Sequence, residues 1–288
     1  MPTDPLTMTV LDLDSALGGN ANLLLAGGFG LYLKQLHLES TKARTLLPAS
    51  RWPRARTTED IDLFLRAEIV ADASQMAHYR AALDRLEFKV EPEAKWLKFR
   101  RSVKGQNVVV DLMVGPMGDL EDATERNAIR VKPRGSSGLH ARATDDALGV
   151  EHEPMRIPIA GTRSDDVGHS CDVLVASAFP FALMKLGALR DRINDTNKDE
   201  GRHHALDLYR IMAMLTESED AVAVELAARF AGHAAIAQAD QIINEYWIPT
   251  IGMGRIRLRE HPLCPKDADT QWLATELRRL LLPLLNQS

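Results

Sequence analysis

Residues 56–65 read RTTEDIDLFL, a short apolar segment that carries two aspartates two positions apart, Asp60 and Asp62. The apolar run from Ile61 to Leu65 predicts a β-strand. Because side chains at i and i+2 of a strand point to the same face, both carboxylates project together. Two such carboxylates repel each other unless a cation lies between them, and Mg²⁺ prefers oxygen ligands of this kind. The alternative is structural: Asp60 caps a turn and Asp62 is solvated on an edge strand.

A third aspartate, Asp111, interrupts the apolar run from Val108 to Val114. A strand that is apolar on both faces is usually central in its sheet, and an ionised carboxylate there is costly unless it is paired or binds a metal. Asp111 is therefore a candidate third carboxylate of the same site. The alternative is a buried ion pair with an arginine such as Arg100 or Arg56.

A Gly-Gly pair follows another apolar run, Leu23–Ala26, and precedes a helical pattern that extends to about Leu38. Glycines at such a position let the backbone approach a ligand, and a helix N-terminus favours phosphate. The spacing around Gly27 and Gly28 fits neither the Rossmann fingerprint nor the Walker A loop.

The flanking segments predict an α+β fold. Around the two aspartate-bearing strands we expect a helix and two further strands, at 74–86, 88–90 and 96–103. Residues 39–58 are expected to form a loop, and the turn-rich residues 115–170 a loop-dominated connector with a few short strands. From Ala178 onward the pattern is helical, with candidates at 178–194, 200–216, 219–231, 234–246 and 268–284. We therefore expect a mixed sheet flanked by helices over residues 1–175, and a helical bundle over 176–288.

The first predicted helix of the second half places Lys185 and Arg192 seven residues apart, and therefore on one face. Asp207 lies 22 residues after Lys185, a separation at which an antiparallel helix pair would bring the two together. The alternatives are a snorkelling surface role for Lys185 and a structural ion pair between Asp207 and Arg192. His203 and Asp207 also share a helix face, but no third metal ligand is in register with them.

The composition describes a folded chain of one large or two small domains. It has 288 residues, 45% of them hydrophobic and 26% charged, which excludes a disordered chain, a collagen and a disulfide scaffold. The net charge is −5, yet residues 41–110 hold 14 basic and nine acidic residues, a net charge of +5. Because this basic stretch brackets Asp60 and Asp62, it predicts a surface that faces phosphate or RNA. Trp52 and Trp96 could stack on a base there, or pack in the core.

The cysteines and the hydropathy of the chain indicate the cellular compartment in which the protein is expected. Cys171 and Cys264 are far apart with no CxxC spacing, so we expect reduced thiols in a cytoplasmic protein and neither a zinc site nor a disulfide framework. The longest run without a polar side chain, Leu23–Leu33, falls short of the ~20 residues that span a bilayer. The first residues lack the basic region of a signal peptide.

These motifs together resemble a known family. A Gly-Gly pair opening a helix, Arg-x-Thr-x-Asp-h-Asp (h, hydrophobic) on a strand at 56–62, and a third aspartate on a later strand are similar to the nucleotidyltransferase superfamily. The segments FALMKLGALRDR (181–192) and HALDLY (204–209) resemble its AbiEii and MenT type, the toxins of type IV toxin–antitoxin and abortive-infection (phage-defence) systems. The resemblance runs from about residue 22 to residue 215.

The resemblance implies a Mg²⁺-dependent enzyme that moves a nucleoside monophosphate from a triphosphate such as ATP to an acceptor hydroxyl. It implies that Asp60, Asp62 and Asp111 bind the metal, that Lys185 binds the triphosphate, and that Asp207 orients Lys185 or acts near the acceptor. The implied nucleotide-binding residues are Gly27, Gly28, Arg56, Thr58, Lys185 and Arg192. The implied partners are an RNA acceptor, with a tRNA 3′ end favoured, and a cognate antitoxin protein, with no membrane. The alternatives are nucleotidylation of a small molecule or a protein, and a non-catalytic nucleotide-binding module of the same fold.

The chain departs from the family pattern in one respect. Gly28 and Asp60 are separated by 31 residues, so residues 39–55 are expected to be an insertion. If the insertion displaces Gly27 and Gly28 from the carboxylates, the phosphate-binding assignment fails while the carboxylate site survives.

Overall fold

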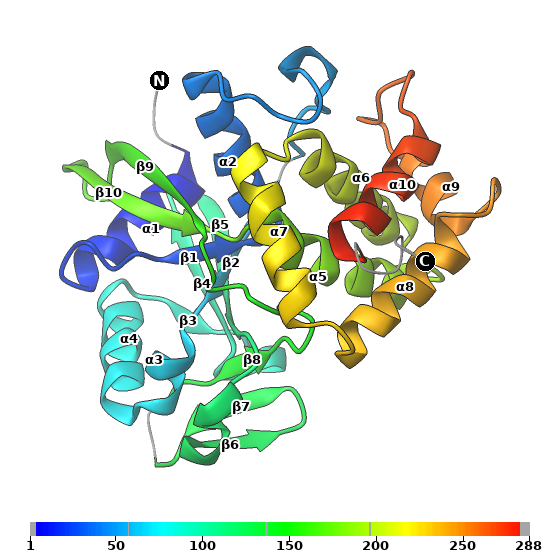
Figure 1. Ribbon diagram of the computed structural model, residues 1–288. Coiled ribbons are helices and arrows are strands. Elements are labelled where there is room, and N and C mark those ends of the chain that lie inside the picture. Colours follow the sequence, from blue (N-terminus) through cyan, green and yellow to red (C-terminus); the bar gives the residue numbers. More distant parts are fainter. Residues whose placement is uncertain (1–3, 57, 136–137, 196, 283–288) are drawn as a thin grey trace. The chain divides into compact units, whose positions relative to one another are not determined.

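The computed structural model describes residues 4–56, 58–135, 138–195 and 197–282, and shows an α+β protein (Figure 1). The chain divides into two compact units, which we describe separately. The first contains residues 1–34, 57–145 and 154–176, and the second contains residues 35–56, 146–153 and 177–288. The expected boundary near residue 175 coincides with the last crossing between the units. Residues 35–56 and 146–153, which we expected in the first domain, instead join the helical unit.

The first unit is built on one mixed sheet, which has ten strands among the described residues. Its main path runs β6-β7-β8-β5-β2-β1-β10-β9, while β4 pairs with β5 and β3 pairs with β4. The strands are β1 (Leu24–Ala26), β2 (Asp60–Phe64), β3 (Lys89–Val90), β4 (Lys98–Val103), β5 (Gln106–Val114), β6 (Thr124–Asn127), β7 (Arg130–Pro133), β8 (Ala141–Ala143), β9 (Met155–Thr162) and β10 (Gly168–Val175). The two aspartate-bearing strands, β2 and β5, are parallel neighbours in the interior of the sheet.

Strand periodicity explains why one face of β2 and β5 is apolar and the other carries acids. Ile61, Val110 and Leu112 are fully buried on one face. Their alternates Asp60, Asp62 and Asp111 point to the opposite face. Asp60 and Asp62 therefore point to the same face, as expected, because both lie on one strand two residues apart.

Four helices are associated with this sheet. Helix α1 (Pro5–Ala16) begins at Asp4, whose side chain accepts hydrogen bonds from the backbone N–H groups of Leu6 and Thr7. It packs on β9 and β10. Helix α2 (Gly27–Thr41) starts directly at the end of β1 and continues into the second unit, and α3 (Ala67–Ala71) and α4 (Ala73–Arg85) follow β2. Short 3₁₀ turns lie at Pro92–Ala94 and Gly118–Ala123.

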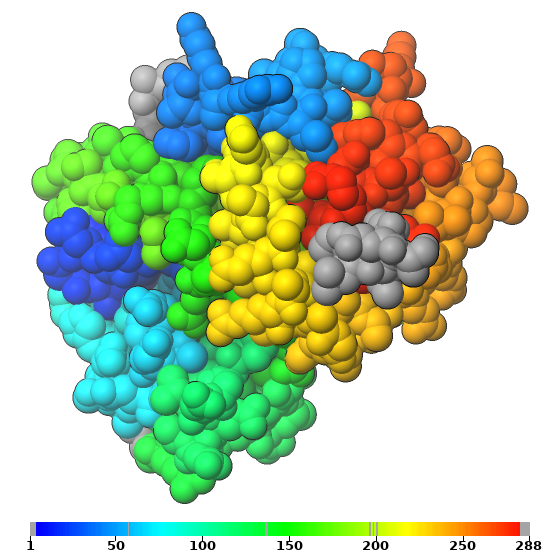
Figure 2. Space-filling view, in the orientation of Figure 1, coloured from blue at the N-terminus to red at the C-terminus, as the bar shows by residue number. Residues whose placement is uncertain are grey.

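The second unit is helical. Its helices are α5 (Ala178–Arg192), α6 (Lys198–Ala213), α7 (Glu217–Arg229), α8 (Ala234–Tyr246), α9 (Met253–Glu260) and α10 (Thr270–Leu281). Helix α5 packs mainly on α6, and α7 packs on α10; Figure 2 shows α7 in yellow beside α10 in red at the surface of this unit. None of the helices in the described part of the chain is long and apolar enough to cross a bilayer.

The predicted insertion is attached to the helical unit. After α2, the backbone N–H groups of Leu46 and Leu47 donate to Leu215 and Ala213, and a 3₁₀ turn follows at Ala49–Arg51. The Trp52 indole is 9% exposed and donates to the Leu47 carbonyl, so Trp52 packs in the core and is not available to stack on a base.

The sequence analysis missed five helices and strands of the described residues, α1, α3, α9, β9 and β10. The connector 115–170 is not loop-dominated throughout, because β9 has eight residues and β10, also of eight, begins within it. Pro158 and Gly161 suggested turns there. However, β9 lies at the end of the sheet path, where a proline need not donate a ladder hydrogen bond.

Candidate functional site

The first unit gathers the three predicted carboxylates along one row of the sheet. Asp62 on β2 is the direct register partner of Asp111 on β5, and Asp60 lies two residues from Asp62 on the same face. Asp60 is exposed, Asp62 is half-buried and Asp111 is buried. The row of carboxylates therefore runs from solvent into the protein. A site that admits a cation and a charged substrate requires such an opening to solvent.

Asp111 is paired, but with residues that the sequence did not suggest. Its Oδ2 lies 2.9 Å from the Lys98 ammonium and 3.6 Å from Nε of Arg142, whereas Arg100 pairs with Glu91 and Arg56 with Asp207. Its Oδ1 is buried and accepts no hydrogen bond from any residue that the structure describes.

Burial raises the pKa of Asp111; Lys98 and Arg142 offset part of this rise, and the nearby Asp62 carboxylate adds to it. A carboxylate with a raised pKa is a better proton acceptor. The buried Oδ1 is the atom that a cation or an acceptor hydroxyl would engage.

Gly27 lies against the same row despite the long insertion. Ala26 is the register partner of Asp62, so the start of α2 is held next to the carboxylate. Gly27 has φ of +62°, and a Cβ at this position would lie 1.7 Å from Oδ2 of Asp62. The insertion has therefore not displaced the glycine pair: Gly27 and Gly28 open α2, as expected, and Thr58 lies beside Asp60, its hydroxyl 3.4 Å from the Asp60 backbone N.

Gly27→Ala is expected to destabilise the protein by about 2–4 kcal/mol. About 1–2 kcal/mol comes from the left-handed backbone and the rest from displacing Asp62. Gly105→Ala is the matched control, because Gly105 has φ of +83° but open space around its Cβ position. Urea unfolding of both variants separates the two costs. Equal losses for the two variants would contradict a tight contact between Gly27 and Asp62.

The second unit contains a buried cationic cluster, which we define as Arg56, Lys185 and Arg210 around Asp207. Lys185 Nζ lies 2.8 Å from Oδ2 of Asp207, and the Arg56 and Arg210 guanidinium groups each lie 3.4 Å from this carboxylate. Arg210 also donates to Gln35 at 2.9 Å. The predicted proximity of Lys185 and Asp207 is thus confirmed, and α5 and α6 supply it.

The charges of this cluster do not balance. Three cations meet one carboxylate, and Asp207 and Arg210 are fully buried. Burial disfavours ionisation of Asp207, yet Lys185, then Arg56 and Arg210, hold its pKa well below the usual range. Among these four side chains, three cations thus share one carboxylate. Arg192, predicted to share this role, is exposed and pairs with Asp195 instead.

His204 lies beside the cationic cluster and stays neutral. Burial, together with the nearby cations Lys185 and Arg56, lowers its pKa to about 3, although Asp207 acts in the opposite direction. The unfolded chain protonates this histidine near pH 6.5, so between pH 6.5 and 3 the unfolded state binds the extra proton. The contribution of His204 to stability is therefore complete above pH 6.5 and is lost as the pH falls.

His204→Gln is expected to flatten the acid limb of the stability profile. Wild-type stability should decline between pH 6.5 and pH 4 with a contribution from His204 of up to about 1.4 kcal/mol per pH unit, which the variant lacks. Chemical unfolding at a series of pH values measures both slopes. Identical slopes for the two proteins would show that His204 is not kept neutral by the fold.

Many charges of the basic stretch 41–110 are engaged in ion pairs. Lys98, Arg100, Arg101 and Lys104 pair with Asp111, Glu91, Asp12 and Asp166. The Arg80 guanidinium lies 5.4 Å from the centroid of the Trp96 ring. The net charge of the stretch thus overstates the positive surface that it can offer to an RNA.

A second metal-ligating group lies elsewhere in the first unit. Among the described residues, three ligating side chains come within 4.8 Å of one another at Asp14, His169 and Cys171, which could hold a metal ion. Burial, together with the nearby carboxylates of Asp14 and Asp172, raises the pKa of the Cys171 thiol to about 12. The carboxylates Asp60, Asp62 and Asp111 form no group this tight. Mg²⁺, however, commonly uses only one or two carboxylates and keeps water in its other positions.

Several of these residues could not be found from the sequence. Lys98 and Arg142 reach Asp111 only through strand register, and Gln35 reaches Arg210 across 175 positions. Arg210 did carry a signal, since it follows Asp207 by three residues on one helix.

Comparisons with known proteins add no relative: no family model, no curated protein and no solved structure matches the chain. The class that the fold and the site define is an α+β protein with a carboxylate row on a mixed sheet and a cationic cluster in a helical unit.

Proposed function

We propose that this protein is a Mg²⁺-dependent nucleotidyltransferase that moves a nucleoside monophosphate from a nucleoside triphosphate to an acceptor hydroxyl. The observation that carries the proposal is the row of Asp60, Asp62 and Asp111 on one sheet face, with Gly27 and the N-terminus of α2 against Asp62. The AbiEii- and MenT-like motifs extend it to an RNA acceptor, with a tRNA 3′ end favoured, and to a toxin role in phage defence.

The donor chemistry fits the metal. All three side chains offer hard oxygen ligands, and the buried Oδ1 of Asp111 has no hydrogen-bond donor among the described residues. Asp60 and Asp62 would hold Mg²⁺, with Asp111 at the inner end of the row. When bound, the metal would neutralise charge on the transferring phosphoryl group.

The chain's own residues would act as follows. The acceptor oxygen attacks the α-phosphorus in line, a new O–P bond forms, and the bond to the β-phosphate oxygen breaks to release pyrophosphate. Asp111, whose pKa is raised, accepts the proton of the acceptor hydroxyl. The backbone at Gly27 and Gly28 and the start of α2 would bind phosphate oxygens.

Lys185 would bind the triphosphate as a point charge. Asp207 is completely buried and therefore acts through Lys185, as a positioning residue. The ion pair between Lys185 and Asp207 holds the ammonium in place and supports this assignment from within the helical unit.

The test is incubation with Mg²⁺, each α-labelled triphosphate in turn, and total tRNA or cell lysate. Label should enter RNA and should be absent with Asp60→Ala or Lys185→Ala. The exposed residues Asp119 and Lys266 supply the matched controls, Asp119→Ala and Lys266→Ala, which should retain activity.

Label in protein or in a small molecule would support nucleotidyl transfer but would show that the acceptor is not RNA. No incorporation, together with no Mg²⁺–triphosphate binding by calorimetry, would overturn the proposal. Triphosphate binding without transfer to any acceptor would favour a non-catalytic module, in which the Lys98–Asp111 ion pair takes the place of the metal.

A further inference from the structure

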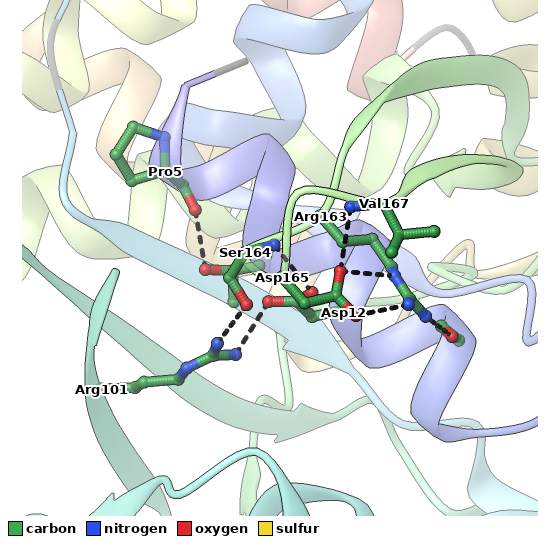
Figure 3. Close-up of polar contacts among 9 residues, drawn as sticks. Pro5, Asp12, Arg101, Arg163, Ser164, Asp165 and Val167 are labelled. Atoms are coloured by element: carbon green, nitrogen blue, oxygen red, sulfur yellow. Dashed lines mark hydrogen bonds and ion pairs between the residues drawn. The ribbon is translucent and has the colours of Figure 1, made fainter. Parts of the chain in front are cut away.

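Helix α1 carries two buried carboxylates that the proposed reaction does not use, Asp12 and Asp14, at 4% and 1% exposure. Asp12 is satisfied: its Oδ2 accepts from Arg101 at 2.9 Å, and its Oδ1 accepts from the Ser164 backbone at 3.1 Å (Figure 3). The position of Asp14 is less favourable for an ionised carboxylate than that of Asp12. Asp14 lies in the last turn of α1, where the helix end bears partial negative charge, and that turn has no basic residue.

The partners of Asp14 include a nitrogen and a sulfur ligand. Oδ1 accepts from the Ala21 backbone at 2.8 Å, while Oδ2 lies 2.9 Å from Nε2 of His169. Cys171 follows His169 by two residues on β10, so both side chains point to the face that α1 covers. One oxygen, one nitrogen and one sulfur atom thus lie within 4.8 Å of one another.

We propose that Asp14, His169 and Cys171 bind one Zn²⁺ ion. A carboxylate, an imidazole and a thiolate together match a cation of borderline softness, whereas Mg²⁺ and Ca²⁺ prefer oxygen ligands alone. Three protein ligands leave one tetrahedral position for water. His169 is only partly buried, with a side chain 23% exposed, so that water and the entering ion have a path to the site.

The required movement is small. Ligands at Zn²⁺ distances of about 2.0–2.3 Å lie about 3.3–3.8 Å apart around a tetrahedral ion. Asp14 and His169, at 2.9 Å, would therefore separate slightly, while the Cys171 sulfur, within 4.8 Å of the other two ligand atoms, would approach them by at most about 1.3 Å.

A zinc ion here would join the C-terminal turn of α1 to β10. The same Asp14 holds the loop that follows α1 through Ala21, and this loop leads into β1. The site is formed by residues other than Asp60, Asp62 and Asp111, so it stands whether or not the protein transfers nucleotides.

The test uses the full chain, stripped with a chelator, loaded with Zn²⁺ and desalted, with bound metal measured by mass spectrometry. We expect one zinc ion per chain and a melting temperature several degrees above that of the stripped protein. Substitution with Co²⁺ should give a thiolate-to-metal charge-transfer band together with tetrahedral visible bands. This spectrum tests the site in the wild-type protein, without any variant.

Cys171→Ser and His169→Ala should each lose the bound zinc and the melting-temperature shift. Cys264→Ala and His78→Ala are the matched controls and should keep both, since Cys264 lies in the helical unit and His78 is exposed on α4. Absence of stoichiometric zinc in the wild type, a cobalt spectrum without a thiolate band, or full zinc retention by folded Cys171→Ser would overturn the proposal.

Discussion

Asp207→Ala is expected to lower the free energy of unfolding by about 3–5 kcal/mol, the usual cost of removing one partner of a buried ion pair. The carboxylate is fully buried and is the shared partner of Lys185, Arg56 and Arg210. Its removal leaves three cations close together with no compensating charge among these four side chains. Urea unfolding, followed by circular dichroism, measures the loss.

Two variants sharpen this measurement. Asp199→Ala is the control on the same helix, since Asp199 is exposed and pairs with Arg202 on the surface, and it should cost less than about 1 kcal/mol. Adding Lys185→Met to Asp207→Ala should recover part of the loss, because one unpaired buried cation is removed. If Asp207→Ala costs no more than Asp199→Ala, the carboxylate does not neutralise the cluster.

Asp62→Ala is expected to reduce nucleotidyl transfer by on the order of a thousandfold, equivalent to about 4 kcal/mol of lost transition-state stabilisation. Asp62 lies at the centre of the carboxylate row, beside Asp111 in register and against Gly27. The measurement is the initial rate of label incorporation at saturating Mg²⁺, with Mg²⁺ affinity measured by calorimetry.

In Asp62→Ala we expect activity to be lost while the stability of the fold is retained. Asp62 is half-buried and its removal relieves repulsion on Asp111, so Asp62→Ala should stay folded while it loses transfer and weakens Mg²⁺ binding. The exposed Asp119→Ala should change neither. Retention of Mg²⁺-dependent transfer by Asp62→Ala would refute the assignment of the carboxylate row.

Local sequence determined the strand that carries Asp60 and Asp62, because two-fold alternation alone puts both carboxylates on one face. It also determined the pairing of Lys185 with Asp207, since a helix, a short turn and an antiparallel helix bring those positions together. The strand preceding Gly27 and the helix that begins there were likewise readable from an apolar run and a glycine pair.

Strand β9 was not readable, because Pro158 and Gly161 suggest turns unless the strand is known to lie at an edge. The cysteine spacing gave no hint of the group at Asp14, His169 and Cys171, whose members come from α1 and β10, about 155 residues apart.

The tertiary structure decided which charges meet. Asp111 was expected to bind a metal or to pair with an arginine such as Arg100 or Arg56; strand pairing placed Lys98 and a different arginine, Arg142, beside it. The fold brings Arg56 to Asp207 from the segment between α2 and β2, and Arg210 lies one turn along the same helix, whereas Arg192 pairs with Asp195. Sequence spacing fixes the neighbours of a side chain within one helix or strand. The electrostatic environment of a buried carboxylate is set by groups brought from other elements, and their identity follows only from the packed fold.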